Sequence, residues 1–354
     1  MDQDTSQSIQ EQVQQARASN MPLRIVGNDS KAFYGQSTTD GQRLSVGEHQ
    51  GIISYEPTEL VIKARAGTPL QDIEQHLAQA NQMLAFEPPA YAQSATLGGT
   101  IACNFSGPRR AFAGSARDFV LGCTLINGQG ERLHFGGEVM KNVAGYDVAR
   151  LMCGAMGTLG VLLDISIKVL PKPETEITLV YELDANESLT KVHEQARQSL
   201  PISATCFDAN RLYVRLSGTE QAVSSARNRL GGEVEENGQQ FWHDLKEHQL
   251  SFFNSNKPLW RLSLASNAPL LKLSGKGLYE WNGALRWLLS DETEQAIRNQ
   301  VERHGGHAIC FKNANADTQI FHTLAPPIQQ LHKNLKHAFD PDGILNPKRM
   351  YADW

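Results

Sequence analysis

The sequence predicts a two-domain protein of the α+β class. Its 354 residues exceed the roughly 100 to 200 that one compact domain usually holds. Glycine-bearing turns interrupt the strands and helices of the first half, whereas strands and helices alternate in the second half. The segment Pro171-Lys172-Pro173 separates these two patterns and is the best candidate for a linker.

The first half begins with a polar helix over residues 8–20 and a strand over 23–26 that enters a turn at 27–30. The segment 59–70 alternates between apolar and polar residues and predicts a strand. At its end, Thr68 is placed to cap a helix that begins with a proline and continues to residue 81.

A glycine-rich stretch, SATLGGTIACNFSGPRR, occupies residues 94–110. After it, residues 118–136 predict a β-hairpin around the turn Asn127-Gly128-Gln129-Gly130. Residues 148–170 then predict a helix, a glycine turn and a long strand.

The second half predicts alternating α/β units. Its expected strands cover residues 177–184, 211–218, 259–266 and 307–313, and its expected helices cover 187–200, 219–232 and 293–306. The tail predicts one further helix that ends at Asp340-Pro341.

Composition excludes several classes of protein. Apolar residues make up 40% of the chain and charged residues 20%, as expected of a folded protein. The net charge of −5 gives no basic field, so no nucleic acid is expected as a partner. The longest uncharged apolar stretch, 151–163, is shorter than the roughly twenty residues of a transmembrane segment. The polar, acidic N-terminal residues predict no secretory signal.

The five cysteines are odd in number, widely separated and without metal-ligand spacing. This pattern predicts reduced thiols in the cytoplasm, with neither a disulfide framework nor a metal site. His304 and His307 are three residues apart, but the glycine pair between them predicts the end of a helix. We therefore expect surface histidines there, and a metal site is the minor alternative.

Signatures of the common nucleotide-binding folds are missing, since the chain has neither G-x-G-x-x-G nor G-x-x-x-x-G-K-[ST]. What it has is three glycine-bearing turns next to strands, at 27–31, 96–100 and 154–160. Successive N–H groups in such turns can converge on an anion without a lysine, and glycine permits a close approach of the ligand. Taken singly, each is as well explained as an ordinary turn.

Taken together, the order of these segments resembles the flavoprotein family related to vanillyl-alcohol oxidase and p-cresol methylhydroxylase, and within it the FAD-binding subunits of glycolate oxidases. The segments that carry this resemblance are IVGNDSKAF, PTELVI.ARAGTPL, FEPP, GPRRAFAGSARDFVLG, FGGEVMKNVAGYDVARLM, GALRWL and DPDGILNPKRMY. The match extends over essentially the whole chain.

The resemblance implies a PCMH-type FAD-binding domain of two subdomains over residues 1–173. A short α/β cap domain would follow over 174–320, and a C-terminal segment over 321–354 would return to the FAD-binding domain. It also implies FAD held without a covalent bond. Some relatives join the flavin to a histidine in the first turn, but here the nearest downstream histidine is His49.

The resemblance further implies which residues contact FAD. The turn that wraps the pyrophosphate maps onto Gly27, Asn28, Asp29, Ser30 and Lys31, and a second contact maps onto Thr96, Leu97, Gly98, Gly99 and Thr100. Toward the isoalloxazine lie Ala102, Asn104 and Gly107, with Asp118 and Val120 near the ring, and Gly157, Gly160 and Val161 at the adenine end.

Catalytic residues are harder to assign. Related dehydrogenases carry a histidine pair and an acidic residue in the cap domain. The expected cap segment of this chain has no histidine-rich run of that kind. Arg261 is the weak candidate to pair with a substrate carboxylate, and a surface or interface arginine is the competing interpretation. Arg109 and Arg110 could equally contact a partner or FAD. Tyr146 and Asp147 are expected to form a structural turn.

The implied function is oxidation of glycolate, a small 2-hydroxy acid, to glyoxylate. Electrons would pass to a second flavin subunit and an iron–sulfur subunit, because the cysteine spacing here provides no cluster site. The catalytic base could lie in a partner, and the expected location is the cytoplasm, with any membrane association through partners. A stand-alone 2-hydroxy-acid dehydrogenase and a non-catalytic scaffold subunit are the alternatives.

Overall fold

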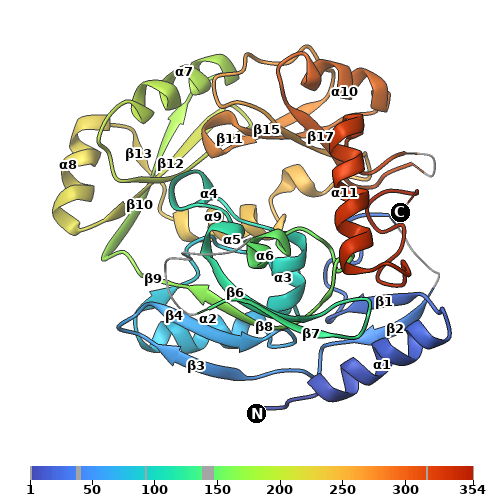
Figure 1. Cartoon of the computed structure of the whole chain (residues 1–354). Coiled ribbons are helices and arrows are strands. Elements are labelled where there is room, and N and C mark those ends of the chain that lie inside the picture. Colours follow the sequence, from blue (N-terminus) through green and yellow to red (C-terminus); the bar gives the residue numbers. More distant parts are fainter. Residues whose placement is uncertain (1, 37–40, 92–93, 138–146, 316–317, 354) are drawn as a thin grey trace. The chain divides into compact units, whose positions relative to one another are not determined.

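Figure 1 shows the fold in a computed structural model that describes residues 2–36, 41–91, 94–137, 147–315 and 318–353. Helices and strands are mixed throughout, which confirms the α+β class. The chain divides into two compact units. Unit 1 comprises residues 1–106, 115–171 and 323–354, and unit 2 comprises residues 107–114 and 172–322.

Unit 1 contains a five-stranded antiparallel sheet in the order β3-β4-β8-β6-β7, a parallel pair β1-β2 and a short antiparallel pair β5-β9. Its strands are β1 (Leu23–Val26), β2 (Gln42–Ser45), β3 (Ile52–Glu56), β4 (Val61–Arg65), β5 (Gln82–Met83), β6 (Val120–Ile126), β7 (Arg132–Gly136), β8 (Val161–Lys168) and β9 (Leu170–Pro171). Its helices are α1 (Ser6–Ala18), α2 (Leu70–Gln79), α3 (Leu97–Cys103), α5 (Ala116–Phe119), α6 (Val148–Leu151) and α11 (Pro326–Phe339).

The core of unit 1 joins the two ends of the chain. On α1, Ile9, Val13 and Ala16 recur at helical spacing and are buried. They belong to one apolar cluster with residues of β1, β2, β6 and β8 and with Ile344 and Leu345 of the C-terminal tail. The tail is therefore part of the core on which β1 rests.

The predicted hairpin over 118–136 is confirmed as β6 and β7, in which Cys123 pairs with Phe135. The predicted cap of α2 is wrong. The Thr68 hydroxyl accepts a hydrogen bond from the Gly51 N–H and donates one to the Gly51 carbonyl, so it is used across the sheet edge.

Unit 2 contains an eight-stranded sheet in the order β13-β10-β12-β11-β15-β16-β14-β17. Its strands are β10 (Thr175–Glu182), β11 (Ile202–Asp208), β12 (Arg211–Gly218), β13 (Glu233–Val234), β14 (Leu259–Ser263), β15 (Lys276–Glu280), β16 (Leu285–Leu289) and β17 (His307–Lys312). Its helices are α4 (Arg110–Ala113), α7 (Ala185–Ala196), α8 (Glu220–Leu230), α9 (Gly238–Glu247), α10 (Glu294–Glu302) and the 3₁₀ turns η1 (Ser251–Phe253) and η2 (Trp281–Gly283).

The predicted alternation of strands and helices in unit 2 is present, but every strand pairing in its sheet is antiparallel. The sequence pattern missed β11, β15, β16 and α9. The strands β15 and β16 flank a four-residue connection, 281–284, whose backbone conformation is unusual, and no common turn signature marks it.

The two faces of the unit 2 sheet differ in character. Leu262, Ala308 and Cys310 lie on the face that packs against Ile297 and Val301 of α10. Because side chains alternate along a strand, the neighbouring residues of β14 and β17 point to the opposite face. That second face carries polar side chains, among them Arg261 and His307.

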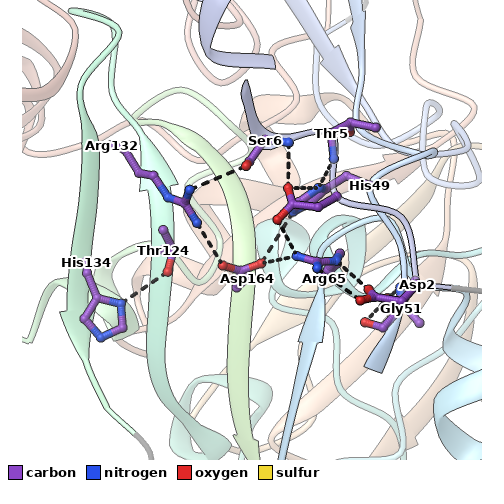
Figure 2. Close-up of polar contacts among 12 residues, drawn as sticks. Asp2, Thr5, Ser6, His49, Gly51, Arg65, Thr124, Arg132, His134 and Asp164 are labelled. Atoms are coloured by element: carbon purple, nitrogen blue, oxygen red, sulfur yellow. Dashed lines mark hydrogen bonds and ion pairs between the residues drawn. The ribbon is translucent and has the colours of Figure 1, made fainter. Parts of the chain in front are cut away.

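A buried charge network joins the N-terminal residues of unit 1 to the central strand β8. Figure 2 shows Asp164 between Arg132 on one side and His49 and Arg65 on the other, with Asp2 beside Arg65. Asp164 Oδ1 lies 3.4 Å from His49 Nε2 and 3.7 Å from Arg65, and Asp164 Oδ2 lies 3.7 Å from Arg132.

The same network holds the segment that precedes β3. The Thr5 N–H donates to His49 Nδ1 at 3.1 Å, so the hydrogen of the ring is on Nε2, toward Asp164. Burial disfavours ionisation of Asp164, but His49, Arg65 and Arg132 outweigh it and lower its pKa. A carboxyl with a lowered native pKa stabilises the fold above its unfolded pKa, and this stabilisation is lost as the pH falls through the folded value.

We expect Asp164→Asn to lower the free energy of unfolding at pH 7 by about 1–3 kcal/mol, because buried donors lose their charged acceptor. We also expect the loss of stability of the wild-type chain below about pH 4 to be shallower in this variant. Urea denaturation between pH 7 and pH 3 measures both effects. Glu59→Gln, which removes an exposed carboxylate, is the control. An identical pH profile for Asp164→Asn and the wild type would contradict the assignment.

Candidate functional site

Unit 1 encloses a cavity of about 210 Å³ beside the end of β1. Its walls come from segments that are distant in sequence: β1 and its turn, the start of α3, the loop before β8 and the C-terminal tail. The lining residues are Arg24, Ile25, Val26, Gly27, Asn28, Asp29, Ser30, Lys31, Ala32, Val46, Ala66, Thr96, Gly98, Gly99, Ala102, Cys103, Met156, Gly157, Gly160, Leu162, Asn346 and Arg349.

The turn after β1 presents free hydrogen-bond donors to this cavity. The backbone N–H groups of Asn28, Asp29 and Ser30 make no hydrogen bond to any described part of the chain. Asp29 has φ +55°, a left-handed conformation that Asp tolerates better than most residues. Successive unused N–H groups of this kind form an anion-binding concavity, so the turn can hold a phosphate group.

Three cationic side chains also line the cavity: Arg24, Lys31 and Arg349. Arg24 lies 3.4 Å from Asp29, the one acidic residue of the lining. Arg349 donates to the carbonyls of Ala32, Tyr34 and Gln36 and so fixes the chain that follows the turn. Burial lowers the pKa of Arg349. The surplus of positive charge fits an anionic ligand.

The segment 96–100 is the start of helix α3, so its prediction as a turn is wrong. The Thr96 side chain caps the helix by accepting from the Gly99 N–H at 3.2 Å. The amides of Leu97, Gly98 and Thr100 donate to protein carbonyls, as the Gly99 amide donates to Thr96. The predicted grip by main-chain amides therefore applies to the turn at 28–30 and not to this segment.

The glycine pair has two different physical roles. A Cβ at Gly98 would lie 2.7 Å from the Cβ of Ala66, so Gly98 is required for packing of α3 against β4. A Cβ at Gly99 would meet only the Thr96 hydroxyl, at 3.2 Å, within the described part of the chain. Since Gly99 lines the cavity, its missing side chain keeps that space open for a ligand.

The C-terminal tail clamps two walls of the cavity together through Asn346. Its Oδ1 accepts from the Ile25 N–H and its Nδ2 donates to the Met156 carbonyl, both at 2.7 Å, and its own N–H donates to the Leu23 carbonyl at 3.0 Å. Gly157 follows Met156 with φ +73°, and a Cβ there would lie 2.6 Å from Asn346 Nδ2. The clamp therefore sets the position of β1 relative to the loop before β8.

A buried ion pair closes the turn that carries Asn346. Lys336 Nζ donates to Asp340 Oδ2 and to the carbonyls of Thr158 and Leu345. Asp340 in turn accepts from the N–H groups of Ile344 and Leu345. Burial lowers the pKa of Lys336, although Asp340 favours its charged form. With these donors and acceptors satisfied, the pair fixes the tail against the loop before β8.

The structure brings together most of the residues that the sequence assigns to cofactor binding. Those that line the cavity are Gly27, Asn28, Asp29, Ser30, Lys31, Thr96, Gly98, Gly99, Ala102, Gly157 and Gly160. They come from three separate segments, which the fold places around one space.

The other assigned residues do not line this cavity. Leu97, Thr100, Val120 and Val161 are buried in the protein interior. Asn104 ends α3 and accepts a hydrogen bond from the Arg117 N–H. Asp118 closes a capping box with Ser115, and Gly107 belongs to unit 2. These side chains have structural partners that the sequence pattern did not reveal.

Sequence reasoning missed Asn346 and Arg349 as members of the site. Both lie in DPDGILNPKRMY, a segment recognised only as part of the resemblance. No spacing rule links this tail to the turn at 27–30, because the contact forms only after folding. The proline and glycine of the segment indicate a turn but do not reveal what that turn contacts.

His307 is exposed at the start of β17, as expected of a surface histidine. All five cysteines, Cys103, Cys123, Cys153, Cys206 and Cys310, are free thiols. Across the described ranges no cluster of His, Cys, Asp and Glu is suited to a metal ion. None of the helices that the structure describes is long and apolar enough to cross a bilayer.

The candidate catalytic residues lie mostly in unit 2. Arg109 forms an ion pair with Glu176, so it has a structural role. Arg110 and Arg261 both lie over the ring of Trp281. Asp147 caps α6 by accepting from the Arg150 N–H, as a structural turn requires, and Tyr146 lies outside the described residues.

Comparison with known proteins identifies relatives of the whole chain and of its first half. Residues 3–136 match the protein family described as FAD binding domain. The chain is 49% identical to glycolate oxidase subunit GlcE of Escherichia coli (strain K12) over 350 residues, which covers 99% of this chain and 98% of the relative.

More distant relatives match less of the chain. Glycolate oxidase subunit GlcD of Bacillus subtilis (strain 168) is 31% identical over 45% of this chain and 34% of its own length. D-lactate dehydrogenase of Anaerostipes hadrus is 33% identical over 40% of this chain and 29% of its own length. A solved alkyldihydroxyacetonephosphate synthase has a TM-score of 0.67 at 14% identity, covering 96% of this chain and 75% of that chain. This similarity confirms the fold.

We expect Asn346→Ala to destabilise unit 1, because it leaves the Ile25 N–H and the Met156 carbonyl without partners. Each loss costs about 1–3 kcal/mol. Chemical denaturation followed by circular dichroism measures the change, and Asn334→Ala, at an exposed position of α11, is the matched control. Equal stability of the two variants would show that the tail does not clamp the cavity.

Proposed function

The chain belongs to the family of the glycolate oxidase subunit GlcE, and we propose that it is an FAD-binding subunit of a glycolate oxidase, which oxidises glycolate to glyoxylate. Its chemistry is that of an FAD-dependent oxidoreductase acting on 2-hydroxy acids. The observation that carries this proposal is the unit 1 cavity, with three unused backbone N–H groups and a surplus of positive charge.

The residues of the cavity fit a dinucleotide with a diphosphate. Asn28, Asp29 and Ser30 would donate their backbone N–H groups to the phosphates, and a charged hydrogen bond of this kind contributes roughly 1.5–3 kcal/mol. Arg24, Lys31 and Arg349 would balance the charge. Gly99 would lie against the cofactor, and Ala102, Gly157 and Gly160 would line its path. Unit 1 is thus the proposed FAD-binding domain, and unit 2 the proposed cap.

The proposed FAD is held without a covalent bond. The turn at 27–30 contains no histidine, and His49 is fully buried. Its Nδ1 accepts from Thr5, and its Nε2 faces Asp164. Neither ring nitrogen is therefore available for attachment to a flavin.

When bound, FAD supplies the acceptor for the two electrons that leave a 2-hydroxy acid during oxidation. The contribution of this chain is to hold the cofactor and to bind the substrate. Arg261 is the proposed contact for the substrate carboxylate, since a guanidinium can pair with a carboxylate through two parallel hydrogen bonds. A catalytic base supplied by a partner subunit is one possible arrangement, and a base within unit 2 is the other.

Electrons would leave through a second flavin subunit and an iron–sulfur subunit. The five free cysteines of this chain are distributed over both units, without the clustered spacing that an iron–sulfur cluster needs. Any association with a membrane would come through these partners.

The visible absorbance spectrum of the purified chain tests the proposal most simply. Flavin absorbance that acid precipitation releases into the supernatant would support non-covalent FAD. A protein that stays colourless after titration with FAD would indicate a scaffold subunit. Anaerobic glycolate then separates a chain that reduces its flavin alone, as a stand-alone dehydrogenase would, from one that requires its partner subunits.

We expect Gly99→Val to weaken FAD binding roughly 10- to 100-fold, because overpacking by a side chain costs about 1–3 kcal/mol. The fold should remain, since the new Cβ meets only the Thr96 hydroxyl within the described chain. Flavin fluorescence titration measures the affinity. Gly218→Val, where a Cβ would meet only Pro201 at 3.7 Å, is the matched control. Full flavin occupancy of Gly99→Val would refute the placement of FAD.

A further inference from the structure

The polar face of the unit 2 sheet carries a group of side chains that the FAD cavity does not use. We define the cationic face as Arg110, Arg261, Trp281 and His307. Arg110 comes from α4, Arg261 from β14, Trp281 from η2 and His307 from β17. All four residues belong to unit 2.

Trp281 occupies the centre of this face in an unusual backbone conformation. Three successive residues, Trp281, Asn282 and Gly283, have φ values of 53°, 57° and 86°. A left-handed conformation at a bulky residue such as Trp is unfavourable and is typical of functional sites. Two contacts hold it: Trp281 Nε1 donates to the Gly107 carbonyl, and the Asn282 N–H donates to the Thr205 hydroxyl.

The guanidinium groups of Arg110 and Arg261 lie 4.3 Å and 5.3 Å from the centroid of the Trp281 ring. These are cation–π distances. Arg261 is half-buried and makes no hydrogen bond or ion pair within the described part of the chain. By contrast, Arg286 and Arg298 of the same unit donate to several carbonyls. The donors of Arg261 are therefore available to an anion.

His307 is the diagonal neighbour of Arg261. Arg261 pairs with Ile309, and Ser263 pairs with His307. Because alternate residues share a face, Arg261 and His307 point to the same side, and such diagonal neighbours are about 7–8 Å apart. The carboxylate and hydroxyl of a 2-hydroxy acid are on adjacent carbons, so one small molecule can contact both side chains.

The charges around His307 come from three elements. They are Arg261 on β14, Arg110 on α4 and His322, which follows β17. His322 itself lies 3.2 Å from Glu302 of α10 and near Arg298. His307 is exposed at the start of β17, but desolvation by the surrounding side chains and these positive neighbours lower the pKa of its imidazole to about 4. At pH 7 the ring is neutral and can accept a proton.

We propose that the cationic face binds a small 2-hydroxy carboxylate, with its carboxylate on Arg261 and its hydroxyl donating to His307, and that binding of the anion enables His307 to hold a proton. A carboxylate on Arg261 cancels part of the positive charge that disfavours the imidazolium. The identification of the ligand as a 2-hydroxy carboxylate rests on the proposed function. The coupling between binding of the anion and protonation of His307 rests on the geometry of unit 2.

In this arrangement, His307 is the group that receives the hydroxyl proton during oxidation. The O–H bond breaks, and its proton passes to a ring nitrogen of His307 and afterwards to water. The hydrogen on the hydroxyl-bearing carbon would leave with its electron pair, for which FAD, when bound, would be the acceptor, and the carbon–oxygen bond would become a carbonyl. A base from a partner subunit is then not needed.

Calorimetric titration of the FAD-loaded chain with oxalate tests the coupling, because oxalate has no carbon-bound hydrogen to give up. Titrations in two buffers of different ionisation enthalpy measure how many protons are taken up. If the bound anion returns His307 to its ordinary pKa of about 6.5, oxalate binds roughly tenfold more tightly at pH 5.5 than at pH 7.5. Net proton uptake near pH 5.5 is then expected.

Three variants make the test specific. Arg261→Gln should weaken oxalate binding about tenfold or more at every pH, because a charged hydrogen-bonded pair is lost. His307→Gln should still bind oxalate but should lose both the proton uptake and the pH dependence. Arg303→Gln removes an exposed arginine of the same unit and should behave as the wild type.

Absence of proton uptake in the wild type, or its persistence in His307→Gln, would overturn the proposal. Loss of the uptake in His322→Gln with its retention in His307→Gln would also overturn it. The proposed function can fail separately. Oxalate binding as expected, in a complex that does not oxidise glycolate, would refute the activity and leave the cationic face as a carboxylate site.

Discussion

Three successive backbone N–H groups, at residues 28–30, make no hydrogen bond within the described part of the chain, and their residues are exposed or half-buried. The C-terminal tail makes this arrangement possible. Asn346 fixes β1, and the Lys336–Asp340 pair fixes the turn that carries Asn346. The fold thereby holds these donors in one fixed turn beside the cavity. An anion that supplies the missing acceptors is bound by a surface already organised for it.

In unit 2, the groups that are available to a ligand are the charged side chains of arginines. Its buried arginines Arg109, Arg286 and Arg298 contact carbonyls or a carboxylate. Arg261 instead lies over the Trp281 ring and makes no hydrogen bond or ion pair within the described residues. The left-handed backbone at Trp281–Gly283 places that ring beside both guanidinium groups. The positive charge of Arg110 and Arg261 disfavours protonation of the neighbouring His307 and favours an anionic ligand.

Local pattern predicted what depends on local physics. The hairpin β6–β7, the strand β1 with its turn, and the helices α7, α8 and α10 of unit 2 follow from turn residues and apolar spacing. The local sequence pattern did not predict two kinds of feature. Segment 96–100 forms a helix because Thr96 caps it and Ala66 packs against Gly98, and both contacts depend on the tertiary fold. Asn346 and Arg349 reach the site from more than three hundred residues away, and His307, exposed as expected, shares a sheet face with Arg261. Its significance depends on the register of β14 and β17.

The central claim is that the amides of the β1 turn, and not those of α3, bind the diphosphate. Amide hydrogen exchange with and without FAD, resolved to short peptides, tests it directly. The N–H groups of residues 28–30 should exchange rapidly in the free chain and become protected when FAD binds. Those of residues 97–100 should change little, since protein groups already accept from them. Protection confined to residues 97–100, with none at 28–30, would contradict the account.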